Sequence, residues 1–283
     1  MSRLLKGILA TAPALAAVGL GAAPAGAQGG SQYDPLIGDL DGDGAADRVT
    51  LGGTPTEGCN ALVELGDGQG GYGAPTSYAF EAPGSDYECP DMGVIVDLGG
   101  DGVSELVLAW FYGSSLPDSD LLVLRDFVPV DGFEAIWEPS RIGTAHIDGD
   151  GLVDVWEYTD QGAGFRTYLN TPDSQLVPGP LVSCEENGSN GYQLHDLDGD
   201  GDVELVQHFD DGCYPEDPYA AGVAVVNGDG SRQVLVASRD LPIWDIDVRD
   251  TDGDGDLDIV TTADTGVVYT HLNNGDGTFA SPK

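Results

Sequence analysis

Basic residues are scarce in this chain. Its 283 residues include 10 Lys and Arg against 49 Asp and Glu, which gives a formal net charge of −39. Nucleic acids and anionic membrane surfaces are attracted by a positive field, which this composition lacks. We therefore predict that neither is a partner. An acidic excess of this size instead favours cations as ligands.

Signatures of several enzyme classes are also missing. The sequence has no GxSxG nucleophile elbow, no HExxH helix and no phosphate-binding P-loop. His195, His208 and His271 stand in or beside expected strands, with no nucleophile paired to them. We therefore predict that the protein is not an enzyme. Carboxylate pairs that cleave glycosidic bonds stay open as an alternative, because acidic residues are abundant and a sequence gives no separations.

Long apolar runs are confined to the N-terminus. A charged start with Arg3 and Lys6 precedes an Ala/Leu-rich stretch over residues 8–20, and small residues follow at 25–27. This order is typical of a secretory signal peptide, so we predict that residues 1–27 are removed on export to the periplasm or the extracellular medium. The alternative is a membrane anchor, although the stretch is short for a span. No later segment is apolar enough to cross a bilayer.

Cysteine is limited to four residues, Cys59, Cys89, Cys184 and Cys213. No two of them form a CxxC pair, which argues against a zinc site. In an exported protein an even number of cysteines favours disulfides, and four cysteines allow three pairings. Order along the chain favours Cys59 with Cys89 and Cys184 with Cys213, because these pairs close loops of similar length.

One acidic motif is present five times. The copies are DLDGDGAAD from Asp39, DLGGDGVSE from Asp97, HIDGDGLVD from His146, DLDGDGDVE from Asp196 and DTDGDGDLD from Asp250. They recur at intervals of about 50 residues, and such a period marks an array of structural units that pack on one another. The period therefore indicates a repeat architecture.

The motif has the chemistry of a calcium site. Acids stand at positions one, three, five and nine of the loop, and glycines at positions four and six let the backbone turn where a Cβ would clash. Ca²⁺ takes six to eight oxygens, including the backbone carbonyl at position seven. The predicted ligands are Asp39, Asp41, Asp43, Ala45, Asp47, Asp97, Asp101, Val103, Glu105, Asp148, Asp150, Leu152, Asp154, Asp196, Asp198, Asp200, Asp202, Glu204, Asp250, Asp252, Asp254, Asp256 and Asp258.

The five loops are not equivalent. The second loop has Gly99 at position three and the third has His146 at position one, whereas the other loops carry all four acids. We expect weaker binding in these two, so the predicted number of Ca²⁺ ions is three to five. Imidazole is a poor ligand for a hard ion, and His146 is expected to pack or to form a hydrogen bond. The alternative for each loop is a solvated acidic turn, but like charges packed this closely without a cation would repel.

β-Branched and aromatic residues follow each acidic loop. These runs are short and have no 3.6-residue apolar period, so they predict strands. The expected strands span residues 48–51, 106–111, 155–158, 205–209 and 259–262. Glycine-rich turns such as GDGQGG from Gly66 and NNGDGTF from Asn273 predict hairpins after the next strand. Each unit is thus expected to have four strands, with the acidic loop between the first and the second.

These units predict an all-β fold. Four-stranded antiparallel sheets arranged radially form a β-propeller, and we expect five blades over residues 28–283, with a sixth blade or an open array as alternatives. The DxDGDGxxD loop, the apolar strand after it and the NNGDGTF-like turn resemble the FG-GAP and VCBS repeat families. The resemblance covers essentially all of residues 28–283. It implies an integrin-alpha-like calcium-binding propeller that binds partners on the face away from its calcium loops.

Long irregular segments and all four cysteines are expected at the rim opposite the acidic loops, where a rigid scaffold usually presents binding sites. These segments are residues 52–60, 82–92, 185–191 and 210–219. We therefore predict an exported calcium-binding propeller that acts as a binding or adhesion module for a protein or glycan ligand on that face. The disulfides could instead only stiffen the loops. The alternative function is a polysaccharide hydrolase or lyase on a propeller scaffold.

Overall fold

The computed structural model describes residues 28–30, 33–54, 56–82, 89–111, 121–133, 139–159, 164–179, 192–209, 222–237 and 243–282. Regular secondary structure in these ranges consists of 20 β-strands. No helix in the described ranges is long and apolar enough to cross a membrane. The predicted signal peptide lies outside the described residues, as do Cys184 and Cys213.

Five antiparallel sheets follow one another along the chain. The first contains β2 (Leu36–Gly38), β3 (Asp47–Thr54), β4 (Gly58–Glu64) and β5 (Thr76–Phe80). The second contains β6 (Met92–Val96), β7 (Glu105–Ala109), β8 (Leu121–Arg125) and β9 (Val128–Phe133). The third contains β10 (Arg141–Ala145), β11 (Asp154–Thr159), β12 (Gly164–Asn170) and β13 (Leu176–Pro178), joined by β1 (Gln28–Gly30).

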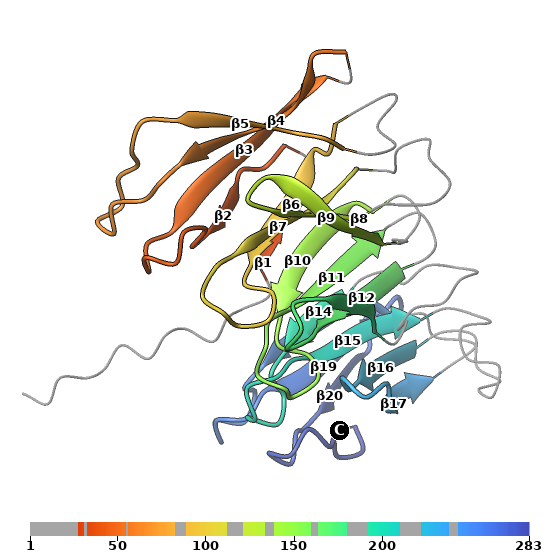
Figure 1. The fold of residues 1–283 in the computed structure, drawn as a ribbon. Coiled ribbons are helices and arrows are strands. Elements are labelled where there is room, and N and C mark those ends of the chain that lie inside the picture. The colour runs from red at the N-terminus through yellow and green to blue at the C-terminus, as the bar shows by residue number, and fades with distance from the viewer. Residues whose placement is uncertain are drawn as a thin grey trace, which may run out of the picture.

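The last two sheets complete the series. The fourth contains β14 (Tyr192–His195), β15 (Glu204–Phe209), β16 (Gly222–Val226) and β17 (Arg232–Ala237). The fifth contains β18 (Ile243–Arg249), β19 (Asp258–Ala263) and β20 (Val268–His271). Figure 1 shows the sheets in chain order, from the red first sheet at the top to the blue fifth sheet at the bottom. The five predicted runs are the second strands of their sheets, so the all-β fold and its repeat are confirmed.

Two sheets depart from four strands. The third gains β1, whose Gln28 and Gly30 pair with Thr144 and Ile142 of β10. The fifth has three strands, and its chain then turns at the bridge between Asn273 and Phe279. A fourth strand is absent there among the described residues. The period predicts the number of sheets, but it does not predict the pairing of so short a segment as β1, which has no pattern of its own.

The core lies between successive sheets. Four buried clusters join the first sheet to the second, the second to the third, the third to the fourth and the fourth to the fifth. Within the described ranges, none joins the fifth sheet to the first. An inner sheet therefore packs on both faces, and β7 and β16 are buried along their whole length. This explains why their sequences, ELVLA and GVAVV, are continuous apolar runs with little or no alternation.

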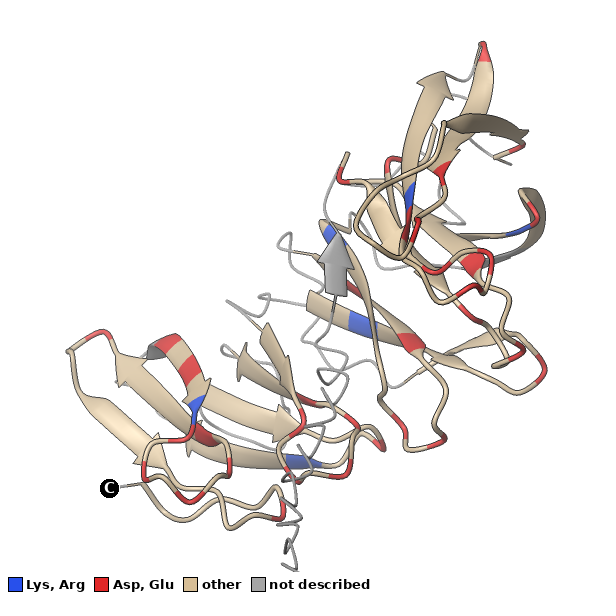
Figure 2. Ribbon diagram, turned by 90° about the vertical axis from the view of Figure 1, so that its left-hand side faces the viewer, with Lys and Arg blue, Asp and Glu red and all other residues tan. Residues whose placement is uncertain are grey.

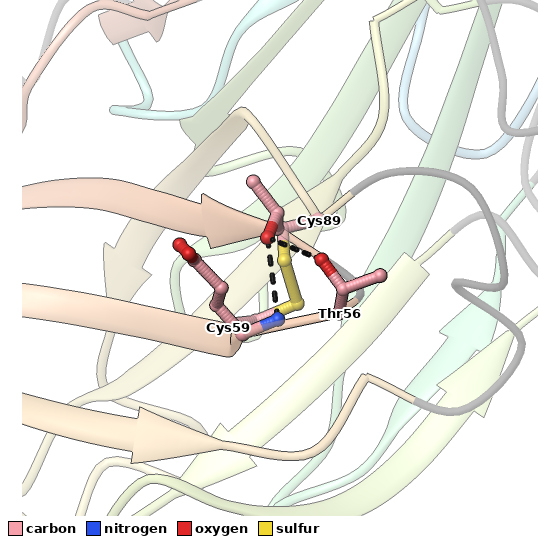
Figure 3. Close-up of a disulfide and its surroundings, with 5 residues drawn as sticks. Thr56, Cys59 and Cys89 are labelled. Atoms are coloured by element: carbon pink, nitrogen blue, oxygen red, sulfur yellow. Dashed lines mark hydrogen bonds between the residues drawn. A yellow bond between two sulfur atoms is a disulfide. The ribbon is translucent and has the colours of Figure 1, made fainter.

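The predicted Cys59–Cys89 disulfide is present, with 5.5 Å between the two Cα atoms. It ties β4 to the segment that precedes β6, and Figure 3 shows Thr56 beside it. Cys59 is buried in the cluster between the first and second sheets. The bond therefore links the first sheet to the chain that enters the second sheet. Such a cross-link is consistent with an oxidising compartment.

Candidate metal centres and neighbouring recesses

Each acidic loop joins the first strand of a sheet to the second, as predicted. When the residue at position one is an Asp, its carboxylate accepts hydrogen bonds from amides later in the loop. Asp39 accepts hydrogen bonds from the amides of Gly42 and Gly44, each at 2.8 Å. Asp196 and Asp250 accept the equivalent bonds in the fourth and fifth loops. The loop amides thus hold a carboxylate at the mouth of the loop.

Positions three and five continue the same pattern. Asp41 accepts a hydrogen bond from the amide of Asp43, and Asp43 accepts one from the amide of Ala45, at 3.2 and 2.7 Å. The same two steps are present in the third, fourth and fifth loops. Alternate side chains are therefore turned toward the inside of the loop, as a cation site requires.

The acid at position nine is buried in all five loops and accepts a hydrogen bond from the amide at position two. In Asp47 each carboxylate oxygen accepts a different amide hydrogen bond, Oδ2 from Leu40 N at 2.8 Å and Oδ1 from Gly66 N at 2.7 Å. Asp154 and Asp258 do the same, with the amides of Asn170 and Asn273 in place of Gly66. Asp258 Oδ2 also accepts a hydrogen bond from the Thr251 hydroxyl. Because Gly66 begins the glycine-rich turn, the acidic loop and the glycine turn of the first sheet lie at the same rim.

Three loops bring carboxylates together. In each of three groups, the ligand oxygens lie within 4.8 Å of one another. The groups are Asp39, Asp41 and Asp43; Asp196, Asp198 and Glu204; and Asp250, Asp252 and Asp254. All-oxygen groups of this kind suit a hard divalent ion. They belong to the first, fourth and fifth loops, which are the loops with four acids. The second and third loops form no such group in the described residues.

The pKa values of two buried acids, one in the third loop and one in the fourth, are raised. Burial raises the pKa of Asp154 to about 7, although backbone hydrogen bonds lower it, and Asp148 and Asp150 add to the rise. Burial also raises the pKa of Glu204 to about 7, with further increases from Asp198 and Asp200. A bound cation would favour the ionised form of a nearby carboxylate. In the fourth loop, where Glu204 belongs to an acid group, the charge distribution is therefore that of a site suited to a positive ligand.

Two asparagines that sequence reasoning missed link neighbouring sheets at this rim. Asn170 Nδ2 donates to the carbonyls of Asp97 and Val153, both at 3.1 Å. Asn273 Nδ2 donates to the carbonyls of Leu197 and Leu257, at 2.6 and 3.1 Å. Each asparagine is buried and joins its own acidic loop to the loop of the preceding sheet. Asn170 ends the third strand of its sheet and Asn273 follows the third strand of its sheet.

Acidic residues concentrate in loops at the ends of the strands, where Figure 2 shows them in red. A recess of about 420 Å³ opens here between the third, fourth and fifth sheets. Its carboxylates are Asp148, Asp198, Asp200, Asp202, Glu204, Asp229 and Asp276, and its basic residue is Arg232. The recess includes two members of the fourth-loop acid group, Asp198 and Glu204.

A second recess, of about 330 Å³, lies between the first and second sheets and is mainly apolar. Tyr78 and Phe127, which both line it, stack directly on each other with ring centroids 4.1 Å apart and planes 6° apart. Asp126 and Phe127 both have positive φ angles, 50° and 63°. That backbone is unfavourable for a Phe, so this turn holds the ring in place at a conformational cost. Asp41 of the first loop lines the same recess.

The predicted binding face lies mostly outside the described residues. Of its long segments, 185–191 and 210–219 fall in the ranges that the structure leaves out, and 82–92 falls there in part. A ligand on that face therefore stays a prediction. The two recesses described above lie on the rim of the acidic loops.

Comparisons with known proteins support the fold. No known family's sequence profile matches the chain, and no curated protein matches it by sequence. A solved lectin from Agrocybe aegerita, which specifically recognises non-reducing terminal N-acetylglucosamine, is similar in structure, with 20% identity and a TM-score of 0.52. The match covers 89% of this chain and 66% of the lectin, so the chain spans slightly less than two thirds of the lectin's length.

A second solved structure is more distant. BBS1N in its complex with ARL6DN shares 13% identity over 92% of this chain and 83% of its own, with a TM-score of 0.36. A score this low supports no inference. The lectin match supports a propeller-like arrangement of the sheets and nothing finer at its level of identity. FG-GAP or VCBS membership stays a prediction.

Proposed function

We propose that this protein is an exported, calcium-stabilised β-propeller that binds glycans. The observation that carries the proposal is the aromatic recess between the first and second sheets, which lies beside the acid group of the first loop. The fold similarity to a lectin is consistent with it. The proposal places the ligand at the acidic rim, where the described residues form a recess.

Calcium would be held by the three acid groups and by the carbonyls at position seven. When bound, it would cross-link the oxygens of a loop and cancel their mutual repulsion. The chain's own residues prepare for this, because Asp39, Asp196 and Asp250 already hold their loops closed through backbone amides. An ion that binds the folded state alone stabilises that state by about 2.7 kcal/mol when its concentration is 100 times its Kd.

The recess matches the chemistry of a sugar. A pyranose ring presents an apolar face of C–H groups and an edge of hydroxyls. The recess offers the outer surface of the stacked Tyr78–Phe127 pair for the face and the carboxylates of Asp41 and Asp126 for the edge. Ligand pockets are mostly apolar, with a few placed polar groups, and a volume of about 330 Å³ is at the small end of their range. One or two sugar units would fit.

A glycan array with N-acetylglucosamine-terminated and unrelated glycans, in excess calcium, tests the proposal. We expect binding, followed by at least a tenfold loss of affinity in Tyr78→Ala, or about 1.4 kcal/mol. Tyr72→Ala is the matched control, because Tyr72 has the same 39% exposure and lies in the turn before β5 but outside the lining of the recess. Its affinity should stay within twofold.

Two results would contradict the proposal. If no glycan on the array binds, the proposed glycan binding is wrong. If Tyr78→Ala binds with wild-type affinity, the recess is not the binding site. A panel of chromogenic glycosides run beside the array tests the hydrolase alternative. Turnover of any substrate would favour an enzyme over a binding module.

A further inference from the structure

We propose that calcium occupies the first, fourth and fifth loops only, and that groups of the protein itself take the place of the ion in the second and third loops. The inference rests on the calcium binding of the proposed function. It goes further in naming His146 and Gly99 as the residues that decide which loops bind.

In the third loop, the imidazole of His146 closes the loop. Its Nδ1 lies 2.8 Å from the carbonyl oxygen of Leu152, and because a carbonyl only accepts, the nitrogen donates. Position one and position seven are thereby joined directly. Position seven is the carbonyl that the motif assigns to the ion, so the imidazole N–H takes the place of the cation.

The rest of the third loop keeps the geometry of the acid-rich loops. Asp148 accepts a hydrogen bond from the amide of Asp150, and Asp150 accepts one from the amide of Leu152. The first loop has the same two bonds. Gly149 and Gly151 have φ angles of 80° and 83°, close to the 77° and 85° of Gly42 and Gly44. The loop is therefore built for an ion, and one side chain prevents it. Replacement of His146 by Asp should restore the site.

The second loop is different, because its backbone has changed. Gly99 has a φ of 88°, whereas its counterparts Asp41, Asp148, Asp198 and Asp252 are not among the residues with positive φ. A Cβ on Gly99 would come within 2.3 Å of Ser174 Oγ in the turn of the third sheet. The Gly99 amide also donates to Asn170 Oδ1 at 3.0 Å. An Asp at this position would adopt a strained φ and would require the Ser174 side chain to move away.

The two ion-free loops are consecutive, and each has a contact at its substituted position that the other loops lack. The Gly99 amide of the second loop donates to Asn170 Oδ1 and lies against Ser174 of the next sheet, and His146 of the third loop donates to the Leu152 carbonyl. The middle of the array would then hold its loops in place without metal, whereas both ends would depend on it. Calcium removal should loosen the two ends of the array and spare its centre.

The test is the number of Ca²⁺ ions bound by the metal-stripped full chain, measured by calorimetric titration with calcium chloride. We expect three ions for the wild type, four for His146→Asp, and three for Gly99→Asp if it folds. Circular dichroism checks folding of each variant. Four ions for Gly99→Asp, or three for a folded His146→Asp, would overturn the assignment of that residue.

Hydrogen exchange of the wild type gives a second readout that needs no variant. Chelation should raise amide exchange at least fivefold in residues 39–47, 196–204 and 250–258, and less than twofold in 97–105 and 146–154. Equal increases in all five loops, or a wild-type count of one, two, four or five ions, would overturn the inference. A count of zero would instead overturn the calcium assignment of the proposed function, so the two failures are distinguishable.

Discussion

Asn170 Nδ2 and the carbonyl oxygen of Asp97 form a hydrogen bond of 3.1 Å between the third sheet and the acidic loop of the second. The residues are 73 positions apart in the sequence. Asn273 makes the equivalent bond from the fifth sheet to Leu197 in the loop of the fourth. The acidic rim is thus held together by buried amides as well as by any ion that it binds.

Replacement of these amides should destabilise the fold. Asn170→Ala leaves the carbonyls of Asp97 and Val153 and the amide of Gly99 without this partner. We expect the free energy of unfolding in urea to fall by about 1–3 kcal/mol, because buried polar groups would lose their hydrogen bonds. The matched control is Asn274→Ala, whose side chain bonds Thr278 in an exposed turn. Its effect should be within about 0.5 kcal/mol, and equal losses in both variants would contradict the role of Asn170.

Stability of the metal-free protein should depend on pH. Burial raises the pKa of Asp154 and of Glu204 to about 7, from 3.8 and 4.5. Both groups hold a proton more tightly in the folded chain than in the unfolded chain. Between pH of about 4.5 and about 7 the folded state therefore carries more protons, and the free energy of unfolding falls as the pH rises.

Urea unfolding of the metal-stripped protein at pH 5, 6 and 7.5 checks this expectation. Saturating calcium should remove the contribution of Glu204 to this pH dependence of the unfolding free energy, because a cation beside that carboxylate favours its ionised form. The contribution of Asp154 should remain, since its loop holds no ion in our account. Stability that rises with pH without metal would contradict the burial of these carboxyls as the cause.

The Cys59–Cys89 disulfide should stabilise the first sheet. We expect the double variant Cys59→Ala/Cys89→Ala to lose about 2–4 kcal/mol of unfolding free energy, because the open chain gains conformational freedom when unfolded. Peptide mapping of the unreduced protein will also test the predicted Cys184–Cys213 pair. Recovery of either cysteine of that pair joined to Cys59 or Cys89 would contradict both assignments.

The sequence alone predicts much of this fold, for a physical reason. The acidic loops and the runs after them are local patterns, and their period of about 50 residues exposes the unit that repeats. The Asn170 bridge joins residues that no local pattern relates, and the β1–β10 pairing depends on three residues with no apolar signal. These features arise from tertiary packing, which a single sequence does not record.

The candidate site also has features that the sequence predicts and features that only the structure shows. The acids at positions one, three and five were evident as candidate ligands, and three of the loops do gather carboxylates. The burial of the acids at position nine was not evident, because it arises from the packing of neighbouring sheets, and the second amide partner of Asp47, Asp154 and Asp258 comes from beyond the loop. The substitutions His146 and Gly99 were visible, but the bond to Leu152 and the approach of Ser174 needed the structure.

Thermal unfolding in excess calcium and in excess chelator tests the central claim most directly. Our account predicts a melting temperature higher in calcium by about 5–11 °C for each ion bound, because each ion adds about 2.7 kcal/mol at a concentration 100 times its Kd and a domain of this size shifts by about 2–4 °C per kcal/mol. Magnesium at the same concentration should give a smaller shift, since it demands an octahedral shell and loses water reluctantly. Identical melting temperatures in calcium and in chelator would contradict the claim.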